Sequence, residues 1–100
     1  MKSKRAKACN ITLRVKQAVY ERDLGLCVIC HKQGIPNAHY IRRSQGGLGI
    51  EQNVVTLCMT CHNDYDNGSK REEYGQIIEN YLSSIYDNWN KEDLVYKKWG

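Results

Sequence analysis

Residues 27–62, CVICHKQGIPNAHYIRRSQGGLGIEQNVVTLCMTCH, decide the fold, because this stretch opens with one Cys-x-x-Cys pair and ends just after a second. Each pair, Cys27/Cys30 and Cys58/Cys61, offers two thiolates from one tight turn. Two such turns brought together supply the four sulfur ligands that tetrahedral zinc prefers. The twenty-seven residues between the pairs exceed the roughly fifteen to twenty of a simple four-cysteine ribbon. We therefore predict a structural Zn²⁺ site with further structure built inside its loop.

The length of the chain is typical of one small domain that needs such a metal. One hundred residues bury only a modest apolar core, and structural zinc adds roughly 10–16 kcal/mol of apparent binding energy to folding. No apolar stretch follows the basic start and no long apolar run occurs, so neither export nor membrane insertion is indicated. We expect a cytoplasmic, reducing location. Cys9 has no partner at ligand spacing and is interpreted as a bystander thiol.

The net charge of +4 is concentrated at the beginning of the chain. Residues 1–30 hold seven Lys/Arg against two acidic residues, whereas the remainder is close to neutral. We expect residues 1–10 to form a basic, disordered arm and residues 11–100 to form a single domain. The arm would either contact nucleic-acid phosphates, because each neutralised phosphate releases counterions, or act as a solvated tail. Its basic residues are Lys2, Lys4, Arg5 and Lys7.

Hydrophobic spacing predicts helices on both sides of the zinc loop. Apolar residues recur at helical spacing over 12–24, with Thr12 as a possible N-cap and Gly25 as a stop. Short extended segments are expected at 38–41 and 53–55, and a short helix at 57–67. A longer helix should start at Ser69, because Ser69-Lys70-Arg71-Glu72 has the spacing of a capping box.

Several short motifs occur in a fixed order along the zinc loop: Ala38-His39, Gly46-Gly47, Asn53-Val54, Leu57-Cys58 and Cys61-His62. In this order the chain resembles the HNH endonucleases, named for their His-Asn-His signature, and particularly the small phage-type members with a four-cysteine zinc site. The match covers about a third of the chain, and its specificity lies in the combination of motifs. The resemblance implies an α+β fold, with a zinc-stapled ββα-metal core (a His-Me finger, treble-clef-like) and flanking N- and C-terminal helices.

The resemblance also implies roles for three residues. His39 corresponds to the general base, Asn53 to the asparagine that ties two strands together, and His62 to a ligand of one catalytic divalent cation (Mg²⁺, Mn²⁺ or Zn²⁺). The chemistry agrees with these roles. A histidine near its ordinary pKa can deprotonate water at neutral pH, and an amide carries a donor and an acceptor in one rigid group.

Two positions bear on how the cation would be held. Asp66 follows His62 by four residues, so on a helix both side chains share a face and could bind one cation; the alternative is a simple helix-end carboxylate. Ala38 stands where most family members have an Asp or His ligand. Three possibilities follow: His62, Asp66 and water hold the cation with the substrate phosphate, the site is weakened, or His39 becomes a ligand. We prefer the first, because Mg²⁺ and Mn²⁺ accept several waters and substrate oxygens.

The expected function is therefore a divalent-metal-dependent DNA endonuclease with His39 as general base. Arg42 and Arg43, beside His39, are expected to contact the phosphate backbone of DNA. The resemblance further suggests phage packaging proteins as partners. The alternative is a zinc-ribbon DNA-binding module without catalysis, which Ala38 favours, and a redox role for the Cys-x-x-Cys pairs ranks third. As single residues, His39 and His62 would also fit purely structural roles.

Overall fold

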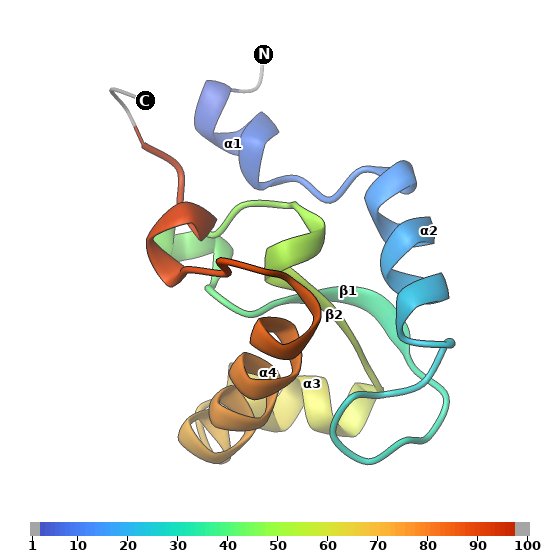
Figure 1. Cartoon of the computed structure of the whole chain (residues 1–100). Coiled ribbons are helices and arrows are strands. Elements are labelled where there is room, and N and C mark those ends of the chain that lie inside the picture. Colours follow the sequence, from blue (N-terminus) through green and yellow to red (C-terminus); the bar gives the residue numbers. More distant parts are fainter. Residues whose placement is uncertain (1–2, 98–100) are drawn as a thin grey trace.

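A two-stranded antiparallel sheet lies at the centre of the fold and has helices around it (Figure 1). The structure is a computed structural model and describes residues 3–97. None of the helices in this range is long and apolar enough to cross a membrane. The small α+β architecture expected from the sequence is confirmed. Its elements are α1 (Lys4–Cys9), α2 (Leu13–Arg22), β1 (Ile35–His39), β2 (Val54–Leu57), α3 (Met59–Asp66) and α4 (Arg71–Ile85), with 3-10 turns at Arg43–Gln45, Glu51–Asn53 and Lys91–Leu94.

Helix α2 begins where the sequence predicts. The Thr12 hydroxyl accepts a hydrogen bond from Val15 N at 3.2 Å, which satisfies a backbone donor in the first turn. The helix ends at Arg22, and the chain then turns through Leu24 and Gly25, both with positive φ. This turn delivers the chain to Cys27.

Strand β1 lies earlier than the segment 38–41 that we predicted. Its pairing with β2 ends at His39 opposite Val54, because the backbone N–H and C=O of Ile41 bond to the side chain of Asn53 instead of to a strand. Between Ile35 and Ala38 the register shifts. The shift coincides with Pro36, which has no N–H to donate to a ladder.

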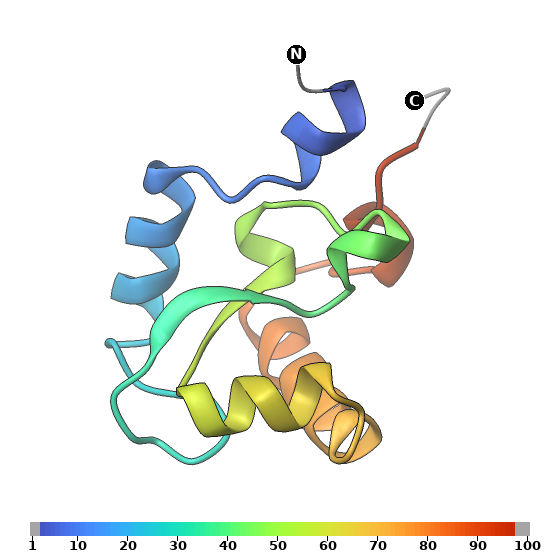
Figure 2. The ribbon, with the colours of Figure 1, turned by 180° about the vertical axis from the view of Figure 1, so that it is seen from behind.

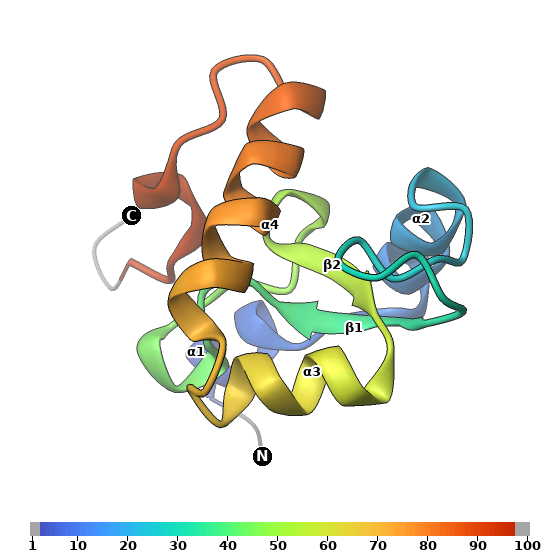
Figure 3. The same cartoon turned by 90° about the horizontal axis from the view of Figure 1, so that it is seen from below.

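The core lies between the sheet and the two helices α3 and α4 (Figure 3). Ala38 pairs with Val55, and both side chains are fully buried in this core. Successive side chains of a strand point to opposite faces, so His39 is directed out of the core and is half-buried. The position that carries a metal ligand in the family pattern is therefore a packing position here. The largest core side chains from α3 and α4 are Tyr65, Ile78 and Leu82.

The predicted capping box at Ser69 is wrong. Helix α4 starts at Arg71, and its N-cap residue, Lys70, makes no side-chain capping bond. The Ser69 hydroxyl instead donates to the Asp64 carbonyl at 3.4 Å. It thus caps the end of α3 and is not available to α4.

The sequence predicts residues 1–10 as a disordered arm, whereas the structure has helix α1 over Lys4–Cys9. Ser3 caps α1 by accepting from Ala6 N at 3.1 Å, and the Cys9 side chain is only 1% exposed. The helix lies against the loop that follows β1 (Figure 2), where Gly49 N donates to Ala8 O at 3.0 Å. These long-range contacts order a segment whose composition alone suggests a free tail. Lys2 lies outside the described residues.

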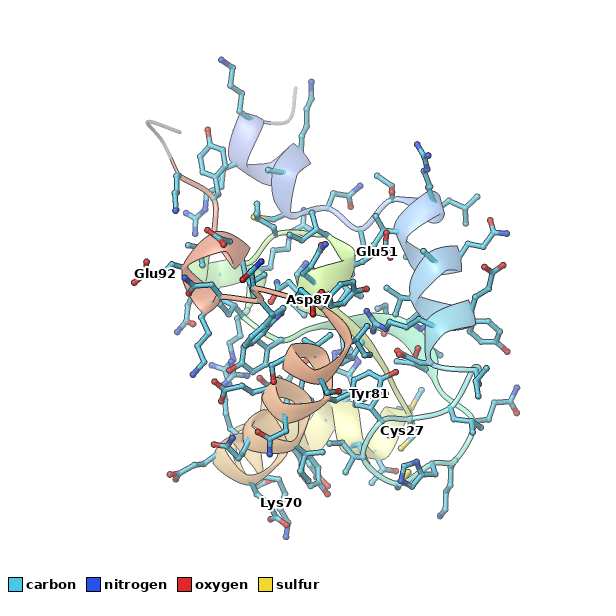
Figure 4. The ribbon with its side chains drawn as sticks, viewed as in Figure 1. Cys27, Glu51, Lys70, Tyr81, Asp87 and Glu92 are labelled. Atoms are coloured by element: carbon cyan, nitrogen blue, oxygen red, sulfur yellow. The ribbon has the colours of Figure 1, made fainter. Side chains whose placement is uncertain are left out.

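A buried ion pair joins α2 to the rest of the domain. Asp23 is fully buried and receives two bonds from the Arg22 guanidinium, at 2.7 and 3.0 Å. The second Asp23 oxygen also accepts from Thr56 N at 2.9 Å, and Tyr81 of α4, labelled in Figure 4, donates its hydroxyl to Asp23. Arg22 in turn donates to Val54 O at 2.8 Å. One ion pair therefore links α2, β2 and α4.

We predict that Asp23→Asn lowers the free energy of unfolding by about 3–5 kcal/mol, because it leaves the Arg22 charge buried without its partner. Chemical denaturation at a fixed zinc concentration measures this loss. Glu79→Gln, which removes the partly exposed ion pair with Lys91 (2.9 Å), is the control and should cost a small fraction of it. Equal losses in the two variants would contradict the role given to the Asp23 network.

Candidate metal centre and catalytic cleft

The four paired cysteines come together at one point. Their Sγ atoms all lie within 4.8 Å of one another, and those of Cys30 and Cys58 are 3.5 Å apart. Four sulfurs at about 2.3 Å from a tetrahedral zinc ion are about 3.8 Å from each other. The cluster lies between the turn that carries Cys27, labelled in Figure 4, and the start of α3. The residues thus fit a structural metal ion such as zinc, as the spacing predicted.

Local backbone geometry prepares these thiols for a cation. Cys58 is the N-cap of α3, and its Sγ accepts from Cys61 N at 3.4 Å. Burial opposes ionisation of Cys27, but backbone N–H groups at Cys30 and Cys58 lower the pKa of Cys27 to about 7. Burial, together with the neighbouring Cys58 and Cys27 thiols, raises the pKa of Cys61. The four thiols cannot all ionise so close together unless a positive ion offsets their charge.

We predict one zinc ion per chain, held by this cluster. Cys58→Ala should lose the metal and, with it, cooperative unfolding, because ligand removal forfeits the zinc contribution to folding. Metal analysis and thermal melting check both effects. Cys9→Ser is the matched control, since Cys9 is a free cysteine outside the cluster, and should keep its zinc. A zinc-free native protein that melts cooperatively would refute the assignment.

A cleft of about 360 Å³ opens where the end of β1, the following loop and α3 meet. It brings together five residues that the sequence singled out and that come from three separate segments: His39, Arg42, Arg43, His62 and Asp66. Asn37 and Ser44 complete its lining. Of the predicted arm, Lys4, Arg5 and Lys7 are exposed on α1 and do not line this cleft.

His62 and Asp66 converge within the cleft. Both lie on α3, and His62 Nε2 is 3.1 Å from Asp66 Oδ2. Asp66 is the last residue of the helix, yet its carboxylate points towards His62. An imidazole nitrogen and a carboxylate oxygen at this separation suit a divalent cation whose other ligands are water or phosphate oxygens.

The ring of His39 is held by the backbone of the N-terminal segment. Its Nε2 lies 2.8 Å from the carbonyl oxygen of Cys9. A carbonyl only accepts, so Nε2 carries the proton and Nδ1 keeps a free lone pair. Burial lowers the pKa of His39 below its ordinary 6.5, and Arg43 and His62 act in the same direction. The neutral ring is therefore the form present at pH 7, with Nδ1 able to accept a proton.

Asn53 braces the loop that follows His39. It is fully buried; its Oδ1 accepts from Ile41 N at 2.8 Å, and its Nδ2 donates to Ile41 O at 3.2 Å and Leu48 O at 2.8 Å. The loop also requires Gly47, because a Cβ there would lie 1.7 Å from Ile41 O. Asn53 and Gly47 thus close the loop that carries Arg42 and Arg43.

Arg42 donates to α3 across the cleft, and Arg43 donates to α1. Arg42 Nη2 donates to Asp66 O at 2.7 Å, and Arg43 Nη2 donates to Ala6 O at 3.4 Å. A guanidinium has five N–H donors. Each of these bonds therefore uses one donor and keeps the charge beside His39, where an anion would bind.

Sequence reasoning missed two side chains of this cleft and the backbone carbonyl that contacts His39. Asn37 precedes His39 by two residues, and strand alternation could have placed both on one face. Ser44 lies in the 3-10 turn Arg43–Gln45, and no pattern in the sequence marked it as part of a site. No sequence signal marked the Cys9 carbonyl either, because every residue carries a main-chain acceptor.

The chain matches no known protein-family model and no curated protein sequence. The geometry of the cleft is therefore the basis for a functional proposal.

Proposed function

We propose that the chain is a divalent-metal-dependent endonuclease that hydrolyses phosphodiester bonds in DNA, of the HNH type that its sequence resembles. The single observation that carries this proposal is the meeting of His39, His62 and Asp66 in one cleft beside Arg42 and Arg43. A base, a cation-binding pair and positive charge are the three requirements of metal-assisted phosphodiester hydrolysis.

The order of elements supports a ββα-metal core. The proposed base lies at the end of β1, the brace Asn53 directly precedes β2, and the proposed cation ligands lie on α3. The four-cysteine cluster anchors the start of that same helix. Strand β1 and helix α3 thus bring His39 and His62 to one cleft, while Asn53 braces the loop that follows His39.

In the proposed reaction, His39 Nδ1 takes a proton from a water molecule as its oxygen attacks the phosphorus atom. The bond from phosphorus to the leaving oxygen then breaks, and the leaving oxygen gains a proton from solvent. Arg42 and Arg43 offset the charge of the phosphate oxygens and orient the phosphate. A divalent cation held by His62 and Asp66 would add further charge stabilisation when bound.

A second cleft, which adjoins the first, supports the proposal that the substrate is a polymer. It has a volume of about 390 Å³, includes Arg5 of α1, and shares Arg43 and Ser44 with the first cleft. A strand of nucleic acid crossing Arg43 would therefore meet positive charge on both sides of the cut. Contacts to phosphates in such a groove are largely independent of base sequence.

We predict that His39→Ala lowers the rate of plasmid cleavage by about 10²–10⁴-fold, because it removes the base, while Mn²⁺ affinity survives. His62→Ala should weaken both. Cleavage assays and calorimetric titration with Mn²⁺ separate the two roles. Asn63→Ala, at the exposed neighbouring position on α3, is the control and should change neither. Equal loss of Mn²⁺ binding in both histidine variants would make His39 a ligand.

The cleavage assay also tests the rival function. The buried methyl group of Ala38 provides no cation ligand, and this favours a DNA-binding module without catalysis. If the zinc-loaded protein binds DNA but leaves it intact with Mg²⁺, Mn²⁺ and Zn²⁺, the endonuclease proposal fails and the binding module stands.

Arg43 should contribute to DNA affinity through charge. We predict that Arg43→Ala weakens DNA binding and reduces the slope of log K against log salt by about 1. The variant makes one fewer phosphate contact, so its binding releases fewer counterions. Arg14→Ala removes the same charge from an exposed position of α2 outside both clefts and should leave the slope near its native value. Binding across a salt series measures both. Identical slopes for the two variants would exclude Arg43 from the interface.

A further inference from the structure

We infer that the N-terminal segment 3–10 is a working part of the active site, because the backbone carbonyl of Cys9 is a positioning group that holds the His39 ring with Nδ1 free. Docking of α1 would then set the cleavage rate, separately from any contact of its basic side chains with DNA. This inference rests on the proposed role of His39 as the base.

The positioning contact is a short hydrogen bond between distant segments. His39 Nε2 and Cys9 O are 2.8 Å apart and separated by 30 positions in the chain. Cys9 is the last residue of α1, and the final carbonyls of a helix lack partners within it. Its oxygen is thus free to accept from His39, while its buried thiol anchors this end of the segment.

The loop after β1 fixes the position of that carbonyl. Gly49 N donates to Ala8 O at 3.0 Å, and Arg5 Nη2 donates to Ser44 O at 3.0 Å. Gly49 also packs so closely that a Cβ on it would lie 2.1 Å from Asn10 O. The loop that places Arg42 and Arg43 in the cleft therefore also holds the segment that orients the base.

Loss of this contact would change the chemistry of the ring. A neutral imidazole has two tautomers, and the hydrogen bond made by one nitrogen decides which nitrogen keeps its lone pair. Without the Cys9 carbonyl, the ring is free to rotate or to carry its proton on Nδ1. In either case the basic nitrogen no longer faces the water that it must deprotonate.

The test is Gly49→Ala in the full chain. The added methyl group cannot fit beside Asn10 O, or beside Ile11 N at 2.9 Å, so the segment must shift. Gly75→Ala is the matched control, because its Cβ would meet Tyr65 at an ordinary 3.6 Å. We expect Gly49→Ala to keep its zinc and Mn²⁺ affinity but to cleave about 10²-fold more slowly or worse. The ¹⁵N spectrum of His39 should at the same time lose the Nε2–H tautomer. Gly75→Ala should match the native protein throughout.

The ¹⁵N spectrum of His39 in the native protein tests the positioning contact even if a variant fails to fold. An Nδ1–H tautomer of His39 in the native protein would overturn the inference, whether or not the protein cleaves DNA. A folded Gly49→Ala variant with native tautomer and native rate would overturn it as well. An Nε2–H ring coupled to the Cys9 carbonyl in a protein that cuts no DNA would support the positioning contact and refute the endonuclease proposal alone.

Discussion

Mutual repulsion of thiolates is the constraint on which the arrangement of the domain depends. Four sulfur atoms within 4.8 Å of one another can all be ionised only around a cation, and a cation held there would tie the turn after α2 to the first turn of α3. His62 directly follows the last of these cysteines. The cluster therefore sets where α3 starts, and with it where His62 and Asp66 lie relative to the sheet. A small apolar core could not impose this position alone.

The opposite side of the cleft depends on hydrogen bonds to the backbone. The Asn53 side chain takes the place of a neighbouring strand as the hydrogen-bond partner of the Ile41 backbone. It also donates to Leu48 O, and this bond closes the loop. It also ends the β1–β2 ladder at His39. The same amide therefore decides both where His39 lies on its strand and how the two following arginines reach the cleft. Rigid support of this kind is what a catalytic geometry requires.

Two further contacts hold the outer helices in place. The Arg22–Asp23 pair fastens α2 and α4 to β2. The N-terminal segment covers the loop after β1 and touches His39 through Cys9 O. Charged and polar residues that composition alone would assign to the surface thus connect separate elements inside the domain. Buried polar groups are tolerated because nearly all of them find partners.

The sequence by itself determined the features that depend on local spacing. These are the two cysteine pairs, the Thr12 cap of α2, the helical i, i+4 placement of His62 and Asp66, and the position of Asn53 beside a strand. Tertiary structure decided the end of β1, the use of Ser69, the burial of Ala38 and the docking of α1. Three of these depend on a partner far along the chain, whereas Ser69 donates to Asp64 O five positions earlier. For Ser69 and for the segment that holds His39, the partner is a main-chain carbonyl. Every residue carries such a carbonyl, so no pattern of residue types marks the one that will be used.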